Sequence, residues 1–553
     1  MHEYEHYEAI VVGAGPGGAA AAAVLAQNDI ETIVLERGIE PGSKNVSGGL
    51  IYAEKSSPYT IDNLFPEFRK FAAERPITEY KLHNISGKKT ATFDLKGLHE
   101  SDTEWCDSVL RRKMDSWLAK EVQGMTQETG GGLLNGIHVN GVLRDENGKI
   151  EGVTCDEIDP ITADVVIAAD GVTSELARSS GLMNWERPEE WFQGVKVVVD
   201  LPEVDNIFGL EPDTGIAHLF SGDLFEGVRG GGFLYTNRES LSIGTVFHLD
   251  SIMEKEAETQ ELLNKLITHP LLGQWIDEDY CELEYSAKLV PDSKKAANPT
   301  PHLDRLLLVG DAGGQMQAQG PIIKGMNHAV TAGALASEAF VEMRDRGSID
   351  KTGERYELKL RQTGVMNKLR PPMYSVVRAI GENKIATTIA DGLVTSPIGR
   401  GAIRLMGNRI EKLYNMPILS MAIPDTSTPY VTLPTVIGEE LGTIIKSKNS
   451  VKPPELSERI SKLAYDTDIG KPHINLIDNS YEASGVAVTA CPVSAVGFGG
   501  GCYRVEEVEI DGKIELRVSL DTQPCIECGT CAVVAKTEWN NPRGNKGVEF
   551  RYG

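Results

Sequence analysis

A glycine-rich turn near the N-terminus constrains the fold more than any other feature of the sequence. Residues 7–12 form an apolar run that predicts a strand, and the alanine-rich residues 19–26 predict a helix. Between them lie Gly13, Gly15 and Gly18 in a G-x-G-x-x-G pattern. The first glycine permits a tight turn, the second lets the backbone approach a pyrophosphate, and the third lets the helix pack on the strand. The pattern predicts a Rossmann-type dinucleotide-binding domain, with the anion at the start of the helix.

An acidic residue selects the kind of dinucleotide. Residues 31–36 predict a second strand, and Glu36 closes it about 20 residues after the glycine pattern begins. A carboxylate at this position accepts hydrogen bonds from the ribose hydroxyls and would repel a 2′-phosphate. The sequence therefore favours NAD or FAD over NADP, with Arg37 as a further cofactor-binding candidate.

Two later strand ends favour FAD. The apolar run that begins at residue 165 ends in Asp170-Gly171, and the run that begins at residue 306 ends in Gly310-Asp311. These strand ends resemble those of the flavoprotein hydroxylase and reductase superfamily. In that superfamily a residue of the Asp311 type binds the ribityl chain of FAD, which makes these four residues cofactor-binding candidates.

A glycine-bounded turn at residues 320–327 leads into a predicted helix. In the same superfamily this helix points its N-terminus at N1 and the C2 carbonyl of the flavin, where it stabilises negative charge that develops on reduction. The resemblance implies a role for Gly325, Met326 and Asn327. Arg111 matches an arginine that the superfamily places near the cofactor. The alternative interpretation is that Arg111 is an ordinary charge on a helix surface.

Five of the eight cysteines lie between residues 491 and 531. Cys525, Cys528 and Cys531 have the C-x₂-C-x₂-C spacing of an iron–sulfur loop, and Cys491, which precedes a proline, is the expected fourth ligand. Four cysteine ligands are the number that one [4Fe–4S] cluster needs, so the sequence predicts a single cluster of this kind. A structural zinc site and a [3Fe–4S] cluster without Cys491 are the alternatives. We expect Cys502 to be a buried thiol rather than a ligand, and the three earlier cysteines to be ordinary core thiols: Cys106, Cys155 and Cys281.

Composition limits the partners and the location. With 80 acidic and 55 basic residues the net charge is −25, which argues against a nucleic-acid partner. No apolar run is long enough for a transmembrane helix, and the charged N-terminus leaves no room for a signal peptide, so a cytoplasmic location is expected. Residues 361–420 differ, with nine Lys or Arg and three acids. One interpretation is that these residues form surface helices whose charge bias arose by chance. The other is that they form a face that contacts an anionic membrane surface or an acidic partner.

These features predict an α/β (α+β) fold in several parts. Residues 1–445 combine a Rossmann-type FAD-binding domain with an interleaved substrate-binding domain. Residues 446–460 are a polar linker that contains two prolines, and residues 461–553 are a one-cluster ferredoxin-like domain. Within the first part we assign FAD binding mainly to residues 1–60, 100–180 and 300–345, and the substrate and membrane region to 180–300 and 361–420.

Nearly the whole chain resembles the electron-transfer-flavoprotein:quinone oxidoreductases, as a FixC-like flavoprotein fused to a FixX-like ferredoxin domain. The FixC-like stretches are residues 42–49, 310–311 and 320–327; the FixX-like ones are 525–531 and 539–553. The resemblance places Ser47, Gly48 and Gly49 beside the isoalloxazine. It implies an electron transfer flavoprotein of the FixA/FixB type as donor, and a membrane quinone, ubiquinone or menaquinone, as acceptor. It also implies a peripheral position on the inner face of the cell membrane and no catalytic acid or base.

Two other functions compete with this interpretation. The flavin motifs alone do not distinguish this family from the similar geranylgeranyl-reductase-like enzymes, which reduce prenyl double bonds; the fused ferredoxin would then be the electron inlet. In the second alternative, the chain is an electron-carrying subunit of a bifurcating Fix-type complex, in which the chemistry starts in a partner.

Overall fold

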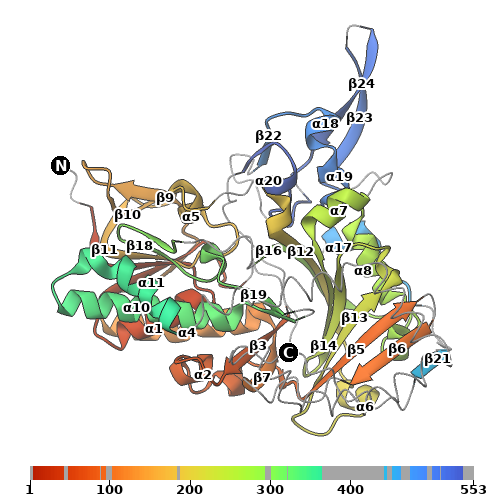
Figure 1. Cartoon of the computed structure of the whole chain (residues 1–553), viewed down its shortest axis with the longest axis horizontal. Coiled ribbons are helices and arrows are strands. Elements are labelled where there is room, and N and C mark those ends of the chain that lie inside the picture. Colours follow the sequence, from red (N-terminus) through yellow and green to blue (C-terminus); the bar gives the residue numbers. More distant parts are fainter. Residues whose placement is uncertain are drawn as a thin grey trace, which may run out of the picture.

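The computed structural model describes residues 4–42, 48–86, 89–94, 103–183, 187–292, 300–319, 322–363, 441–444, 451–461, 474–494, 501–510, 512–522 and 524–539. In this part of the chain two eight-stranded sheets lie beside each other, and a smaller C-terminal region projects from the end of the second sheet (Figure 1).

The first sheet confirms the predicted Rossmann-type unit. Its strands run in the order β17-β18-β11-β1-β2-β8, with β10 and β9 branching from β11. The core strands β18, β11, β1, β2 and β8 are parallel. Their bounds are β1 His6–Val12, β2 Thr32–Glu36, β8 Gly132–Asn135, β9 Val139–Arg144, β10 Ile150–Cys155, β11 Ile161–Ala168, β17 His302–Leu303 and β18 Leu306–Leu308.

Helix α1 (Pro16–Ala26) is buried along its whole length, because it packs against both α10 (Met326–Asp345) and α4 (Arg111–Glu128). The crossing with α10 is close: a Cβ on Gly333 would lie 2.0 Å from the Gly17 carbonyl oxygen. The small side chains of α1 permit this approach and fix the start of α10 beside the glycine turn. The helices α5 (Glu175–Ser179) and α11 (Thr352–Gln362) complete this part.

The second sheet is interleaved with the first in sequence. Its order is β16-β12-β15-β14-β13-β5-β6-β21. One face is covered by α7 (Leu249–Lys255) and α8 (Thr259–Ile267), and the other face looks toward the first sheet (Figure 1). The strand bounds are β5 Glu79–Ser86, β6 Lys89–Asp94, β12 Trp191–Asp200, β13 Ile216–Gly222, β14 Gly230–Thr236, β15 Ser240–His248, β16 Glu282–Pro291 and β21 Leu441–Ile444.

Small elements connect the two large sheets. They are a three-stranded sheet of β3 (Gly49–Glu54), β7 (Thr103–Val109) and β4 (Arg75–Pro76), the hairpin of β19 (Gln317–Gln319) and β20 (Ile322–Lys324), and the short helices α2 (Ile61–Leu64), α3 (Phe68–Phe71) and α6 (Val204–Phe208).

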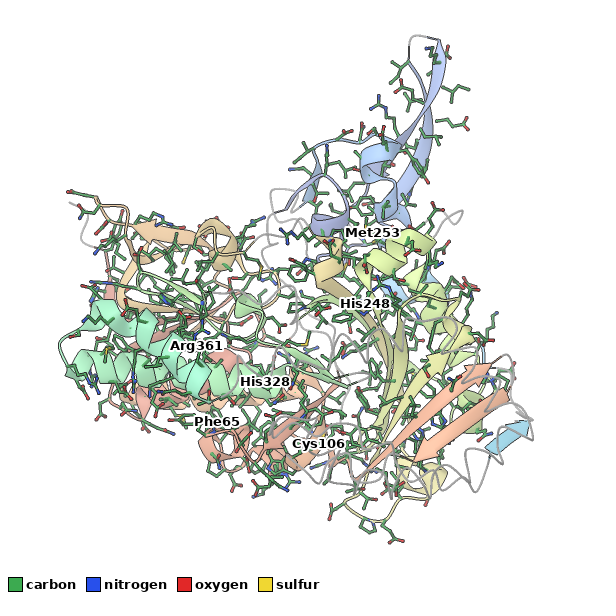
Figure 2. The ribbon with its side chains drawn as sticks, in the orientation of Figure 1. Phe65, Cys106, His248, Met253, His328 and Arg361 are labelled. Atoms are coloured by element: carbon green, nitrogen blue, oxygen red, sulfur yellow. The ribbon has the colours of Figure 1, made fainter. Side chains whose placement is uncertain are left out.

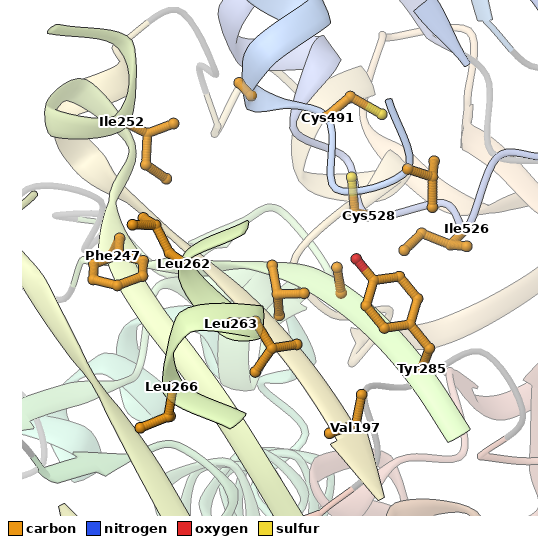
Figure 3. Close-up of a cluster of buried hydrophobic side chains, with 14 of the residues drawn as sticks. Val197, Phe247, Ile252, Leu262, Leu263, Leu266, Tyr285, Cys491, Ile526 and Cys528 are labelled. Carbon is orange, nitrogen blue, oxygen red and sulfur yellow. The ribbon is translucent and has the colours of Figure 1, made fainter. Parts of the chain in front are cut away.

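The C-terminal region shares a hydrophobic core with the second sheet. Leu263, Tyr285, Cys491 and Ile526 belong to one buried cluster (Figure 3). The region contains α18 (Tyr481–Ser484), α19 (Val486–Ala490), α20 (Cys531–Val534), the pair β22 (Ile474–Leu476) and β25 (Thr537–Trp539), and the hairpin β23 (Tyr503–Ile510) and β24 (Lys513–Leu520). The segment before it contains α17 (Leu456–Ser461), whose Arg459 is 1 % exposed and held by Glu282 of β16.

Other sequence expectations have mixed outcomes. Cys106 is buried as expected, but Cys281 is exposed, so it is not a core thiol. Among the helices in the described ranges, none has the length and hydropathy of a membrane-spanning segment. Most of the basic segment, residues 364–420, lies outside the described residues, and so does Ser47.

Candidate functional site

A cavity of about 550 Å³ lies between the two large sheets, at the carboxyl ends of β1, β2, β11 and β18. This edge of an open α/β sheet is where ligands bind. Gly18 and Asn327 do not line the cavity. The sequence-predicted cofactor residues that do line it are Gly13, Gly15, Glu36, Arg37, Gly48, Gly49, Arg111, Asp170, Gly171, Gly310, Asp311, Gly325 and Met326.

The glycine turn has the geometry that its sequence predicts. Gly13 has a φ of +96°, and a Cβ there would lie 2.4 Å from the Ala169 carbonyl oxygen. A Cβ on Gly18 would lie 1.9 Å from the Gly13 carbonyl oxygen, so this glycine allows the helix to close on the turn. A Cβ on Gly15 would lie 3.5 Å from Arg111 Nη2, at ordinary van der Waals distance, so the start of α1 is open to an anion in the cavity.

Glu36 and Arg37 lie at the end of β2. The Glu36 carboxylate accepts hydrogen bonds from the backbone N–H groups of Ala14 (2.8 Å) and Gly38 (2.7 Å), so it also fixes the glycine turn. Arg37 Nη2 lies 4.0 Å from Oε2 of Glu527. Its Nη1 is buried and has no hydrogen-bond partner among the described residues. Such an orphaned donor beside the cavity fits a polar or anionic ligand group.

Arg111 and Asp311 form the middle of the site. Arg111 binds both oxygens of Asp115, with Nε–Oδ1 at 3.0 Å and Nη2–Oδ2 at 2.7 Å. Burial lowers the pKa of Arg111, but Asp115 outweighs this effect, and the net shift is upward. Burial raises the pKa of Asp311, and the nearby Arg111 opposes that shift. Arg111 is therefore a half-buried cation, held in place by Asp115 at the cavity, rather than a free surface charge.

Asp170 lies at the cavity edge but also has a structural role. Its Oδ1 accepts a hydrogen bond from the Ser174 hydroxyl at 2.7 Å, and Ser174 is the N-cap of α5. Burial raises the pKa of Asp170 to about 6, against the lowering effect of that hydroxyl. Next to Asp170, Gly171 has a φ of +78°, a conformation that favours glycine.

The start of α10 meets the residues that follow the 43–47 segment. A Cβ on Gly49 would lie 3.0 Å from Met326 Cε, and a Cβ on Gly325 would lie 3.9 Å from Asp311 Oδ1. Two stretches that are far apart in sequence, 48–49 and 325–326, thus form one end of the cavity. Asn327 is buried behind this end, and its Oδ1 has no hydrogen-bond partner within the described ranges.

The sequence analysis assigned the substrate region to residues 180–300 but named none of the individual residues that form the second half of the cavity. Its floor is one face of the second sheet and is mostly apolar; the residues are Phe192, Lys196, Phe233, Tyr235 and Val246, with His248 at the end of β15 (Figure 2). Met316 and Ile323 also line the cavity, and they belong to one hydrophobic cluster with Phe192. The available signal was alternation within strands such as residues 191–200, which marks a face but not what the face encloses.

A second, much smaller cavity is lined by sulfur. Its lining contains the four predicted ligands and one more cysteine: Cys491, Cys502, Cys525, Cys528 and Cys531. Cys502 is buried, as expected, and it interacts directly with Cys491 and Cys525. The described residues contain no group of three or more His, Cys, Asp or Glu side chains arranged to hold a single metal ion.

Strand β16, which lines the large cavity, is hydrogen-bonded to the cysteine loop. The Leu289 N–H donates to the Cys528 carbonyl oxygen at 2.9 Å, and Lys288 Nζ donates to the Glu527 carbonyl oxygen at 3.0 Å. Lys288 and Leu289 both line the large cavity. The Tyr285 hydroxyl donates to the Pro492 carbonyl oxygen at 2.6 Å, and in Figure 3 it points toward the cysteine-bearing loops. The cysteine loop is therefore bound directly to the wall of the large cavity.

Comparisons with known proteins agree with this architecture. The Thi4 family pattern matches residues 1–57. Protein FixC of Escherichia coli K12 is 36 % identical over 341 residues, covering 61 % of this chain and 76 % of FixC. Protein FixC of Salmonella typhi is 33 % identical over 401 residues, 70 % and 90 % of the two chains. The probable electron transfer flavoprotein-quinone oxidoreductase YdiS of E. coli K12 is 32 % identical over 371 residues, 66 % and 84 %.

A solved structure has the same fold. The geranylgeranyl bacteriochlorophyll reductase-like protein of Thermoplasma acidophilum superposes with a TM-score of 0.55 at 22 % identity, covering 70 % of this chain and 90 % of that one. The superposition shows that the chain has the fold of FAD-dependent oxidoreductases. The sequence matches to the FixC proteins and YdiS show that it belongs to the FixC and electron-transfer-flavoprotein–quinone oxidoreductase family.

Proposed function

We propose that this chain is an electron transfer flavoprotein:quinone oxidoreductase that holds FAD and one [4Fe–4S] cluster. It takes electrons from an electron transfer flavoprotein of the FixA/FixB type and delivers them to a membrane quinone, alone or within a bifurcating Fix-type complex. The observation that carries the proposal is the Leu289–Cys528 hydrogen bond, which joins the cysteine loop to a strand that lines the large cavity. An FAD passes one or two electrons and a [4Fe–4S] cluster passes one, so the pair matches a one-electron donor to a two-electron acceptor.

The large cavity suits FAD. The open space beside Gly15 and the N-terminus of α1 suit the pyrophosphate, and Glu36 with Arg37 suits the ribose end. Arg111 and Asp311 suit the middle of the molecule, and the 325–326 and 48–49 segments suit the isoalloxazine. The remaining assignments are Gly13 and Gly18 for the turn, Asp170, Gly171 and Gly310 for the strand ends, and Ser47 and Asn327 for the flavin end.

The small cavity suits an iron–sulfur cluster. The residues that we assign as its ligands are Cys491, Cys525, Cys528 and Cys531. The loop that carries the last three is closed by two residues with positive φ, Glu527 at +56° and Gly529 at +86°. A cubane binds one thiolate at each iron, so its ligands surround a volume rather than a point.

The apolar floor of the large cavity suits a quinone ring. Phe192, Phe233 and Val246 provide the apolar lining, together with Met316 and Ile323. A quinone carries a lipid tail, so we place the chain peripherally on the inner face of the membrane, with residues 361–420 as the contact. Charge reversal at Arg400, Arg404 and Arg409 should then weaken binding to anionic liposomes; unchanged binding would exclude this segment.

The test of the whole proposal is an anaerobic titration of the purified chain with dithionite, followed by visible absorbance, EPR and metal analysis. We expect one FAD and one [4Fe–4S] cluster per chain, both reoxidised by a soluble quinone analogue. Zinc in place of iron would overturn the cluster. Reduced centres that ignore quinone and discharge into a prenyl lipid would favour the geranylgeranyl-reductase-like function, and a chain that needs its partners to reduce quinone would favour the bifurcating complex.

A further inference from the structure

Lys196 is a cation on the otherwise mainly apolar floor of the large cavity. It lies on β12, in register with Gly244 of β15, which is in turn in register with Phe233 of β14. A Cβ on Gly244 would lie 2.7 Å from Lys196 Cγ and 2.5 Å from Phe233 Cζ. The glycine therefore leaves the space in which the lysine stem and the ring meet, with Nζ 5.1 Å from the ring centroid. The absence of a side chain at Gly244 thus accommodates this lysine within the sheet.

The ammonium group is fixed at the junction of the two halves of the cavity. Nζ donates a hydrogen bond to the Gly48 carbonyl oxygen at 2.7 Å, and Gly48 belongs to the segment that suits the isoalloxazine. An ammonium has three N–H donors. Within the described part of the chain Nζ makes no second hydrogen bond, so two donors remain for a molecule in the cavity.

The charges around Lys196 set its protonation. Burial and, to a smaller extent, Arg111 on α4 lower the pKa of Lys196, Glu284 on β16 opposes them, and the resulting pKa is about 8. The other titratable groups that line the cavity from the second sheet are Tyr235, His248 and Lys288. Burial raises the pKa of Tyr235, so that phenol keeps its proton at neutral pH. A group whose pKa is near the working pH is a better proton donor than either extreme.

We propose that Lys196 donates one of the two protons that quinone reduction consumes. The inference rests on the proposed quinone reductase function and adds a proton source to it. The quinone gains two electrons, which originate in the electron transfer flavoprotein, and two protons. One Lys196 N–H bond breaks, one O–H bond forms at a quinone oxygen, and the nitrogen keeps the electron pair as a neutral amine. Water supplies the second proton and reprotonates the amine.

Two substitutions separate proton donation from charge. Lys196→Met removes both, whereas Lys196→Arg keeps a cation that does not lose its proton near neutral pH. We expect quinone reduction, measured with dithionite-reduced holoenzyme and a soluble quinone analogue, to fall about 100-fold in both variants. The alkaline decline of the wild-type rate, with a midpoint near pH 8, should be absent from both. The control is Lys149→Met, at an exposed turn between β9 and β10, which should keep the wild-type rate and pH profile.

A second readout needs no turnover. A charge that titrates beside bound FAD shifts the visible absorption bands of the oxidised protein. We expect this spectral titration in the wild type and in Lys149→Met between about pH 6 and pH 10, and not in either Lys196 variant. FAD and iron contents equal to wild type would show that the variants fold.

The outcomes are distinguishable. A Lys196→Arg variant with the wild-type rate would show that only the charge matters, and would overturn proton donation. A Lys196→Met variant with the wild-type rate and pH profile would overturn it as well. If the wild-type chain binds FAD and iron but reduces no quinone, the proposed function fails together with the inference.

Discussion

Arg459 and Glu282 form a buried ion pair that fastens the segment before the cysteine region to the second sheet. Arg459 Nε lies 2.8 Å from Glu282 Oε2, and its Nη2 lies 2.6 Å from Oε1. The two side chains are 1 % and 2 % exposed. The guanidinium also stacks 5.1 Å from the ring centroid of Tyr285, whose hydroxyl holds the Pro492 carbonyl next to Cys491. Arg459 therefore holds α17 in place and also supports the loop that carries Cys491, a predicted cluster ligand.

Substitution Arg459→Met should destabilise the chain by about 3–5 kcal/mol, because it leaves the Glu282 carboxylate buried without its partner. Urea unfolding, with limited proteolysis of the segment around α17, measures the effect. The double variant Arg459→Met/Glu282→Met should recover most of the loss, since an apolar pair replaces the ions. A single variant as stable as wild type would contradict the role of this pair.

Substitution Glu36→Gln should weaken FAD binding about tenfold or more. The carboxylate accepts hydrogen bonds from Ala14 and Gly38, and an amide replaces one acceptor oxygen with a donor that faces an N–H group. Flavin fluorescence after dilution or ultrafiltration measures the dissociation constant. Glu40→Gln, which alters an exposed carboxylate paired with Arg112, is the matched control and should bind FAD normally. Equal FAD affinity in both variants would exclude Glu36 from the site.

Substitution of the cysteines should distinguish ligands from neighbours. Cys528→Ser should lose the [4Fe–4S] EPR signal and most of the iron while FAD remains bound, since the two cavities are separate. Cys502→Ala should keep four irons per chain, although this thiol lies against Cys491 and Cys525. Iron and acid-labile sulfide analysis decides the matter. If Cys502→Ala loses iron and Cys491→Ala keeps it, the fourth ligand has been assigned to the wrong residue.

The stability of a Lys196→Met variant should depend on pH in a defined direction. Lys196 has a folded-state pKa of about 8, below that of a lysine in the unfolded chain. Between these two pKa values the unfolded chain binds more protons, so this lysine makes stability rise with pH, and at pH 7 the buried ammonium reduces stability.

We therefore expect the Tm difference, variant minus wild type, to favour the variant by a few degrees more at pH 7 than at about pH 9.5. The lost hydrogen bond to Gly48 is common to both pH values, so the change between them isolates the charge. Thermal unfolding of the holoenzyme followed by circular dichroism measures it, and a Tm difference independent of pH would contradict a depressed lysine pKa.

Local sequence signals predicted the first half of the site well. The glycine pattern and the flanking apolar and alanine-rich runs correspond to β1 and α1, and the helix predicted after the turn at residues 320–327 is α10, Met326–Asp345. These features depend on turn geometry and on periodicity within a few residues, which a single sequence displays directly.

The second half depends on contacts between distant residues. Lys196 is recognisable only once β12, β15 and β14 are aligned, because its neighbours Gly244 and Phe233 are selected by strand register and not by a motif. Cys502 is a similar case. Hairpin β23–β24 returns the chain so that the Asp521 N–H donates to the Cys502 carbonyl oxygen at 2.7 Å, which brings residue 502 close to the loop that begins at Cys525. Spacing along the sequence cannot reveal such a fold-back.

The hydrophobic core that β16 shares with the cysteine region has a consequence for assembly. Tyr285 and Leu289 on one side and Cys491 and Ile526 on the other bury one another, as the two halves of an obligate interface do. In one chain these halves meet at an effective concentration set by the connecting segment, which does not fall when the protein is dilute. Two separate polypeptides with the same surfaces would instead dissociate on dilution and expose this hydrophobic core to solvent. The covalent connection thus keeps the core buried at any expression level.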